Sequence, residues 1–143
     1  MTPAQRSLAM KRVKLKNGSI EKLVQQGLSR RGLRFHRHVR SLPGSPDIVF
    51  IREKVAVFVD GDFWHGWRLA TWEHKLSPFW RDKLHANRLR DRRNFCRLRA
   101  KGWTVVRIWQ HQVKENLSLC IERIVSAKTL KQRMSPGGGF RQG

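Results

Sequence analysis

Three aspartates and a histidine lie close together in one short stretch, PDIVFIREKVAVFVDGDFWHGW, residues 46–67. Asp47 precedes the apolar run IVFI, and Asp60 and Asp62 follow the run VAVFV. If the two runs pair as a tight hairpin, the start of the first strand lies beside the end of the second. The acids then converge on one edge, where their mutual repulsion favours a hard cation, and oxygen-rich clusters suit Mg²⁺.

Each of these residues also has an ordinary structural interpretation. Asp47 follows a proline in a place where surface turns are common, and Asp-Gly-Asp can be a solvated turn. A single histidine is more often structural than catalytic, although His65 could act as a general base near neutral pH. A metal held by acids, a base and a cationic surface would together make a phosphodiester hydrolase.

The chain is strongly basic, with 31 Lys and Arg against 10 Asp and Glu and a formal charge of +21. Such an excess attracts polyanions, and nucleic acid is favoured over a membrane because no apolar run approaches the roughly 18 residues of a spanning helix. No secretory signal is expected, since the first residues lack an apolar segment. Cys96 and Cys120 lie too far apart for a metal knuckle, which suits a reducing, cytoplasmic location.

The 143 residues are the length of one domain. Apolar spacing predicts alternating helices and strands. The expected elements are a helix over 20–32 capped by Ser19, strands over 33–39, 48–51 and 55–61, an irregular loop over 63–80, a helix over 79–102, a strand over 103–110 and a helix over 116–133. The pattern predicts an α/β or α+β domain on a mixed sheet. We expect a basic arm at 1–18, the folded domain at 19–127 and a basic flexible tail at 128–143.

Two of these helices have an expected buried stripe. It comprises Ile20, Leu23, Val24 and Leu28 in the first, and Leu84, Leu89, Phe95 and Leu98 in the second. Trp103 and Trp109, which flank or lie on the last strand, are expected in the core.

Five sequence blocks together resemble one known family. They are RSLAMKRVK, IEKLVQQGLSRRGLRFHRHVRSLPGSPDIVF, VAVFVDGDFWHG, FWRDKLHANRLRDRR and GWTVVRIW. In this order and spacing they resemble the very short patch repair (Vsr) DNA endonucleases, a branch of the PD-(D/E)XK nuclease superfamily, over about residues 6–125. The resemblance implies a single-domain, restriction-endonuclease-like α/β fold with a central mixed sheet flanked by helices. It also implies a Mg²⁺-dependent enzyme that nicks one strand next to a T·G mismatch.

The resemblance assigns roles to residues of the site. Asp47 matches the metal-binding aspartate, Glu21 the helical glutamate near the site, and His65 the histidine that activates water. The main-chain carbonyl of Val59 would be a second metal ligand, and Asp60 takes a position that is often histidine or aspartate.

Three aromatic residues match the family's DNA wedge. Phe63 and Trp64 match the pair that enters the base stack, and Trp80 matches an aromatic on the opposite side. Opening a base step costs a few kcal/mol and costs least at a mismatch, so preference for mispaired DNA could follow from the wedge.

The chain departs from the family at the structural zinc. Its ligand positions read Asp62, Trp67, Leu69 and His111. The resemblance therefore implies no structural zinc, with packing by Trp67, Trp72 and Phe79 in its place. Asp62 either adds a ligand to the catalytic metal or faces solvent.

The helix over 79–102 contains nine Lys and Arg and only two acids, Asp82 and Asp91. It is expected to follow DNA phosphates without reading sequence. The residues of this helix that are expected to contact DNA are Lys83, Asn87, Arg90 and Arg93. Double-stranded DNA is the expected partner of a monomer, with a repair or defence protein as a further one.

Two alternatives to mismatch repair stay open. One is a related nuclease that nicks or cleaves DNA in homing, restriction or phage defence. The other is a DNA-binding module without catalysis, against which the joint presence of Glu21, Asp47 and His65 argues.

Overall fold

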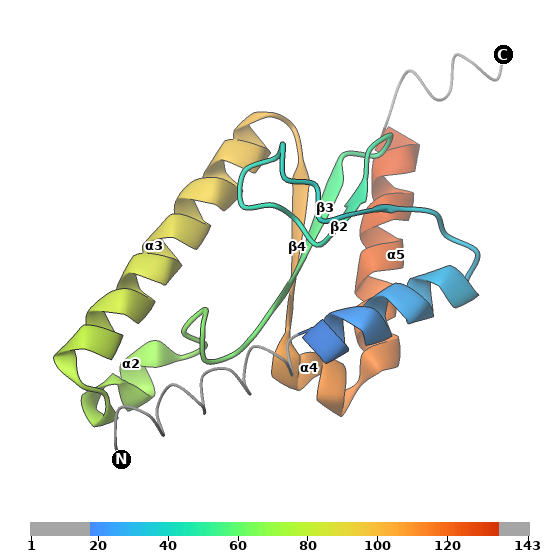
Figure 1. Ribbon diagram of the computed structural model, residues 1–143. Helices are drawn as coiled ribbons and strands as arrows, with labels where there is room; N and C mark the ends of the chain where they lie inside the picture. Colours follow the sequence, from blue (N-terminus) through green and yellow to red (C-terminus); the bar gives the residue numbers. More distant parts are fainter. Residues whose placement is uncertain (1–17, 135–143) are drawn as a thin grey trace, which may run out of the picture.

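A four-stranded mixed sheet is the centre of the molecule (Figure 1). The computed structural model describes residues 18–134. The strands lie in chain order: β1 (His36–Arg37), β2 (Ile48–Phe50), β3 (Val55–Asp60) and β4 (Thr104–Trp109). β1 pairs antiparallel with β2, β2 antiparallel with β3, and β3 parallel with β4. The expected mixed sheet and its hairpin are confirmed.

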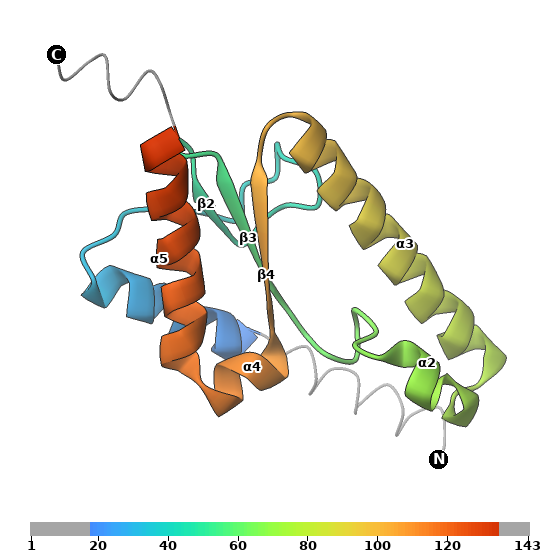
Figure 2. The same ribbon diagram turned by 180° about the vertical axis from the view of Figure 1, so that it is seen from behind.

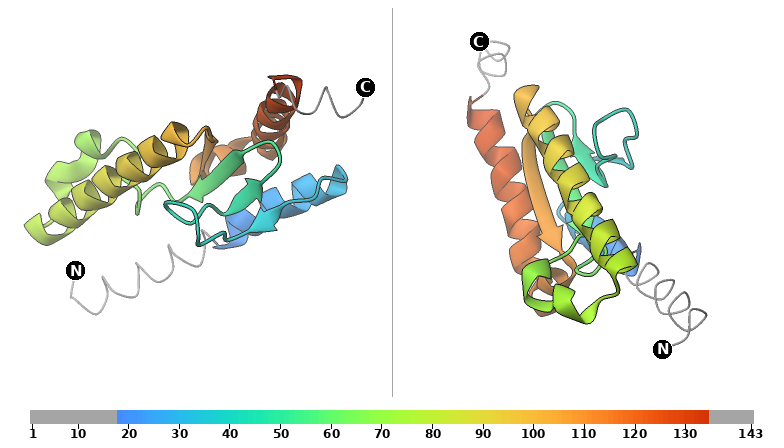
Figure 3. Two further views of the ribbon diagram at one scale, coloured as in Figure 1. Left: turned by 90° about the horizontal axis from the view of Figure 1, so that it is seen from above. Right: turned by 90° about the vertical axis from the view of Figure 1, so that its left-hand side faces the viewer.

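Helices cover both faces of this sheet (Figures 2 and 3). Residues 18–30 are helical and lie on the same side as α5 (Leu117–Met134), whereas α3 (Pro78–Ala100) covers the other face. Three short elements complete the order: α2 (Leu69–Trp72), the 3-10 helix η1 (Glu73–Lys75) and α4 (Gln110–Glu115). No helix within residues 18–134 has the length and apolar character required to cross a membrane.

Side chains of β3 alternate between two hydrophobic clusters, as a strand requires. Val55, Val57 and Val59 pack in the larger cluster with residues of the first helix and of α5. Ala56 and Phe58 pack in the smaller one against Phe95 and Leu98 of α3. Because both faces of β3 are buried, its run is apolar throughout until it ends at Asp60.

The hairpin brings the beginning of β2 next to the end of β3. Ile48 pairs with Val57 and Phe50 with Val55, and the turn between them closes with Lys54 at a left-handed φ of 56°. The backbone N–H of Asp47 donates to the carbonyl of Val57 at 3.0 Å. The strand pairing thus ends where the acidic residues begin.

Several local expectations differ from the structure. The first strand is only two residues long, and both side chains are exposed. Ser19 lies inside the first helix and is not its cap, because that helix already includes residue 18. The segment 63–80, expected as a loop, contains α2 and η1. α5 continues to Met134, so residues 128–134 are helical; the rest of the expected tail and residues 1–17 of the arm lie outside the described residues.

Two leucines that were expected to be buried lie on the exposed faces of their helices. Leu23 is 44% exposed, and Gln25 is buried in that turn beside Val24. Leu89 is 48% exposed, and Asp91 is buried in α3 together with Leu84, Phe95 and Leu98. In both helices a polar group takes a place on the inner stripe, so it needs a buried partner. Trp103 and Trp109 are half-buried.

The contrast between two leucines of α3 is a test of this packing. Leu98→Ala should lower the free energy of unfolding by about 2–5 kcal/mol, because Leu98 is fully buried beneath Ala56 and Phe58. Leu89→Ala on the same helix should cost no more than about 0.5 kcal/mol. Urea unfolding of both variants measures the difference, and equal costs would contradict the orientation of α3.

Candidate active site

Asp47 is held at the edge of the sheet by the backbone of β3. Its Oδ2 accepts a hydrogen bond of 2.7 Å from the N–H of Val59. Because β2 begins opposite Val57, this N–H has no partner in β2. Burial raises the pKa of Asp47 to about 7. The hydrogen bond from Val59 opposes this shift, and the nearby carboxylates of Glu21 and Asp60 add to it.

An imidazole that sequence reasoning missed lies between Glu21 and Asp47. His38 Nε2 is 2.9 Å from Glu21 Oε1, and its Nδ1 is 4.0 Å from Asp47 Oδ1. The backbone of His38 has a left-handed φ of 51°, and its N–H donates to the carbonyl of Asp47 at 3.1 Å. Burial raises the pKa of Glu21, whereas His38 and Arg37 lower it. Donor atoms of Glu21, His38 and Asp47 lie within 4.8 Å of one another.

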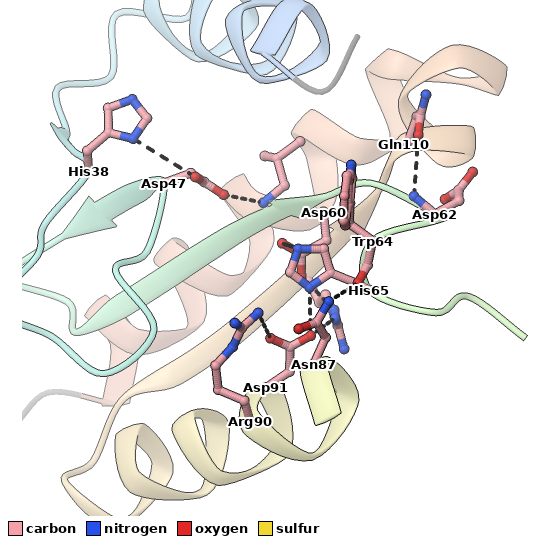
Figure 4. Close-up of polar contacts among 12 residues, drawn as sticks. His38, Asp47, Asp60, Asp62, Trp64, His65, Asn87, Arg90, Asp91 and Gln110 are labelled. Atoms are coloured by element: carbon pink, nitrogen blue, oxygen red, sulfur yellow. Dashed lines mark hydrogen bonds and ion pairs between the residues drawn. The ribbon is translucent and has the colours of Figure 1, made fainter. Parts of the chain in front are cut away.

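His65 lies between two other carboxylates in a buried ionic network (Figure 4). Its Nδ1 is 2.6 Å from Asp91 Oδ2, and its Nε2 is 3.4 Å from Asp60 Oδ1. Arg107 binds both acids, with Nε 2.8 Å from Asp60 and Nη2 2.7 Å from Asp91. Pairing of this kind offsets the high cost of burying charges.

The charged groups of this network shift one another's pKa. Burial alone would lower the pKa of His65, but the hydrogen bond to Asp91 and the charge of Asp60 raise it overall. Burial raises the pKa of Asp60 despite His65 and Arg107. The pKa of Asp91 is lowered, because its bonds to the two cations outweigh its burial. Perturbed groups of this kind cluster at functional sites.

One cavity joins the two groups. It has a volume of about 540 Å³, and its walls include Glu21 and Asp47 on one side and Asp60, His65 and Asp91 on the other. Within residues 18–134, these are also the residues of the two sets that could hold a metal ion, with His38 completing the first. The structure therefore brings together four of the five expected catalytic residues.

Asp62, the fifth of them, lies apart from this cavity. Its Oδ1 is 2.9 Å from Nδ1 of His111, and its backbone N–H donates to Gln110 Oε1 at 3.3 Å. Trp67 packs against His111 with ring centres 4.6 Å apart, and Leu69 is fully buried. An ion pair and packing thus occupy the four positions where the family resemblance placed zinc ligands.

The expected replacement packing is only partly seen. Trp67 also packs against Trp109 at 5.0 Å, in agreement with its expected role. Trp72 stacks on Phe63 at 5.7 Å in a different cluster, and its contact with Trp67 is a hydrogen bond of 2.8 Å from its Nε1 to the carbonyl of Trp67. Phe79 is 67% exposed and fills no space in this loop.

The three expected wedge residues form one aromatic cluster. Trp80 lies 6.2 Å from Phe63 and 5.9 Å from Trp64, and the latter two rings are 5.6 Å apart. All three are half-buried, and Trp64 Nε1 has no hydrogen-bond partner in the described chain. Asn87, expected to contact DNA, donates to the carbonyl of Trp64 at 3.0 Å and so supports the loop.

The expected DNA contacts on α3 divide between solvent and the cavity. Lys83 and Arg93 are exposed. Arg90 is exposed as well, yet it lines the cavity, with its Nη2 3.9 Å from Asp91 Oδ1.

Sequence signals existed for two of the missed residues. Asp91 lies in register with the buried stripe of Leu84, Phe95 and Leu98, where an acid is out of place. Arg107 interrupts an apolar strand directly opposite Phe58. A buried acid and a half-buried base at such positions indicate an internal ion pair.

The network predicts how His65 titrates in the metal-free protein. By NMR its pKa should lie above the ordinary 6.5, and Asp91→Asn should lower it, because the strongest anionic partner is lost. Since the folded pKa is the higher one, this stabilisation is complete below about pH 6.5 and is lost as the pH rises through the folded pKa.

The matched control is Asp82→Asn, which removes an exposed acid from the same helix and should leave the His65 titration in place. A His65 pKa below 6.5, or one that Asp91→Asn does not move, would contradict the network.

Comparisons with known proteins identify the family of this chain. The family model described as DNA mismatch endonuclease Vsr matches residues 1–71. A type II nicking enzyme of Neisseria meningitidis serogroup C is 36% identical over 141 residues, covering 94% of this chain and 93% of that protein. A type II nicking enzyme of Xanthomonas oryzae pv. oryzae is 38% identical over 117 residues, with 80% and 86% covered. DNA mismatch endonuclease Vsr of Escherichia coli K12 is 34% identical over 109 residues, with 75% and 70% covered. The chain therefore belongs to the Vsr family and is a DNA endonuclease.

Proposed function

We propose that this endonuclease uses Mg²⁺ to nick one strand of duplex DNA next to a T·G mismatch. The observation that carries the proposal is the single cavity in which Asp47 and the end of β3 face His65 and its two carboxylates. The aromatic cluster follows in the next residues of the chain, so the site for cleavage and the rings for opening a base step are adjacent.

The donor groups suit a hard divalent cation. Asp47 and Glu21 offer carboxylate oxygens, and the carbonyl of Val59 is our proposed main-chain ligand beside Asp47. Bound there, Mg²⁺ would supply stabilisation of the negative charge that develops on the phosphate. We leave Asp62 out of the ligand set, because its carboxylate is engaged by His111 outside the cavity.

His65 is our candidate for the general base. With Nδ1 directed to Asp91, its Nε2 is the nitrogen left to accept a proton from water. Asp60 lies beside that nitrogen and is oriented by Arg107, so we assign it a positioning role. Only neutral imidazole can accept the proton, so the cleavage rate should rise with pH through the raised pKa of His65.

The aromatic cluster supports recognition of mispaired DNA. Phe63, Trp64 and Trp80 pack mainly on one another, and the buried indole N–H of Trp64 lacks a partner in the described chain. Insertion would give these rings base faces to stack on, at a step that is easiest to open when mispaired. Exposed Lys83, Arg90 and Arg93 on α3 are our candidates for holding the phosphates nearby.

We propose that the chain acts as a monomer and that its one candidate site among the described residues cleaves a single strand. The names of the two type II nicking enzymes reported above support this reading. Those names also favour a second candidate, a nicking enzyme that serves a restriction system. A labelled duplex carrying T·G, compared with its fully matched counterpart, separates the two, because the second role predicts cutting without regard to the mismatch.

The metal assignment predicts the effect of Asp47→Ala. Cleavage of the T·G duplex in Mg²⁺ should fall by at least about 10³-fold, since loss of the metal removes several kcal/mol of stabilisation. DNA binding should stay near normal or tighten, because an acid that repels phosphate is gone. Strand-cleavage assays and fluorescence anisotropy measure the two effects.

Asp82→Ala is the matched control, since Asp82 is an exposed acid outside the cavity, and this variant should cleave normally. Normal cleavage by Asp47→Ala, or undiminished cleavage by the parent in a chelator, would remove Asp47 and the metal from the mechanism.

The wedge predicts a loss of discrimination. In the double variant Phe63→Ala with Trp64→Ala, the ratio of T·G to matched cleavage should fall by at least about tenfold, because a few kcal/mol of unstacking is no longer offset. Each truncation should cost less than the roughly 3 kcal/mol of a core aromatic, as both rings are only half-buried.

The control for this experiment is Phe79→Ala, which removes an exposed ring that touches Trp80. Its discrimination ratio should match that of the parent. A folded double variant that keeps the full mismatch preference, or one that fails to fold, would count against the wedge.

A further inference from the structure

A second hollow lies on the first helix, beside the candidate site. It is a groove of about 900 Å³ between this helix and the segment that leads into β1. Its cationic residues are Lys22, Arg30, Arg34 and Arg37. Glu21, one residue from Lys22, lines the catalytic cavity, so the same helix borders both hollows.

The groove has the charge of an anion site. Its lining, which falls within residues 18–134, includes no aspartate or glutamate. Lys22, Arg30 and Arg34 form no ion pair with a carboxylate among the described residues, in contrast to neighbouring Arg31, which pairs with Glu122. Unneutralised cations gathered in a concave surface concentrate anions there.

A chain of hydrogen bonds joins this groove to the candidate metal site. Arg37 Nη1 donates to Gln25 Oε1 at 3.4 Å, and Gln25 Nε2 donates to Glu21 Oε1 at 3.0 Å. Glu21 in turn contacts His38, next to Asp47. Gln25 is only 8% exposed, so its amide is held between an arginine of the groove and a carboxylate of the site.

We propose that the groove binds backbone phosphates of the duplex that flanks the cleavage site, and that Arg37 and Gln25 couple this contact to Glu21. The proposal rests on the proposed function only where cleavage is the readout. A duplex is the fitting ligand because it presents a regular row of phosphates, one charge per about 1.7 Å of its axis, to cations spread along a helix and a strand. A duplex seated at Glu21 has its flank beside this helix.

The binding part of the proposal is tested by charge removal. In the double variant Arg30→Gln with Arg34→Gln, the slope of log affinity against log salt should decrease in magnitude by about 1.8, or about 0.9 for each phosphate released. The matched control is Lys101→Gln with Arg133→Gln, which removes two exposed charges outside the groove lining, one in the turn after α3 and one at the end of α5. This control should keep the parent slope.

Duplex length gives an independent readout. On DNA shortened stepwise on one side of the cleavage site, the affinity deficit of Arg30→Gln with Arg34→Gln should vanish once the flank no longer reaches the groove. A deficit that is the same at every length, equal slopes for the two double variants, or no deficit would overturn the proposal.

The coupling part is tested with Gln25→Met, which keeps the length of the side chain but cannot bridge Arg37 and Glu21. DNA with long flanks should be cleaved faster than short DNA by the parent, but not by Gln25→Met. The affinity of Gln25→Met for long DNA should stay within about twofold of the parent, a difference of about 0.4 kcal/mol. Arg37→Gln is the companion variant, because Arg37 is exposed and its loss should leave the fold intact. It should lose the stimulation as well.

Stimulation that persists in both variants would overturn the coupling. If the parent protein cleaves no duplex at all, the proposed function fails, but the salt slope and the length series still decide whether the groove binds DNA.

Discussion

The hydrogen bond from the N–H of Val59 to Asp47 is the contact on which the site depends. It exists because β2 begins opposite Val57 whereas β3 continues to Asp60, which leaves the N–H of Val59 free to bind the carboxylate of Asp47, just before β2. A buried carboxylate without such a donor would carry a large desolvation cost. The apolar hairpin therefore specifies the position of Asp47, and through it the place where Glu21 and His38 can meet.

The opposite wall of the cavity obeys a different constraint, the neutralisation of buried charge. Asp60, His65, Asp91 and Arg107 come from β3, the loop after it, α3 and β4, and each contacts an opposite charge. Removal of Arg107 would leave two buried carboxylates with His65 as their shared partner, at a cost in charge neutralisation. The same contacts that orient His65, our candidate general base, thus also bind α3 to the sheet.

The loop after β3 is held by contacts at positions where the resembled family has its zinc ligands. Asp62 pairs with His111 at the start of α4, and the ring of Trp67 covers that pair. The loop from Asp62 to Trp67 contains Phe63, Trp64 and His65, so these contacts fix both ends of the segment that bears the rings and the imidazole.

The sequence by itself determined the hairpin, the mixed sheet and the meeting of Asp47 with Asp60, because two continuous apolar runs and the short turn between them are local properties. It also determined the basic character of α3, yet not its phase, since leucine and arginine alternate too irregularly to show that Asp91 faces inward and Leu89 outward. Only the tertiary structure decided that His65 lies between Asp60 and Asp91, that His38 joins Glu21, and that Asp62 turns away to His111. The physical reason is that a buried charge is stabilised by whichever opposite charge the packing brings near, and those partners are up to 49 residues away in the chain.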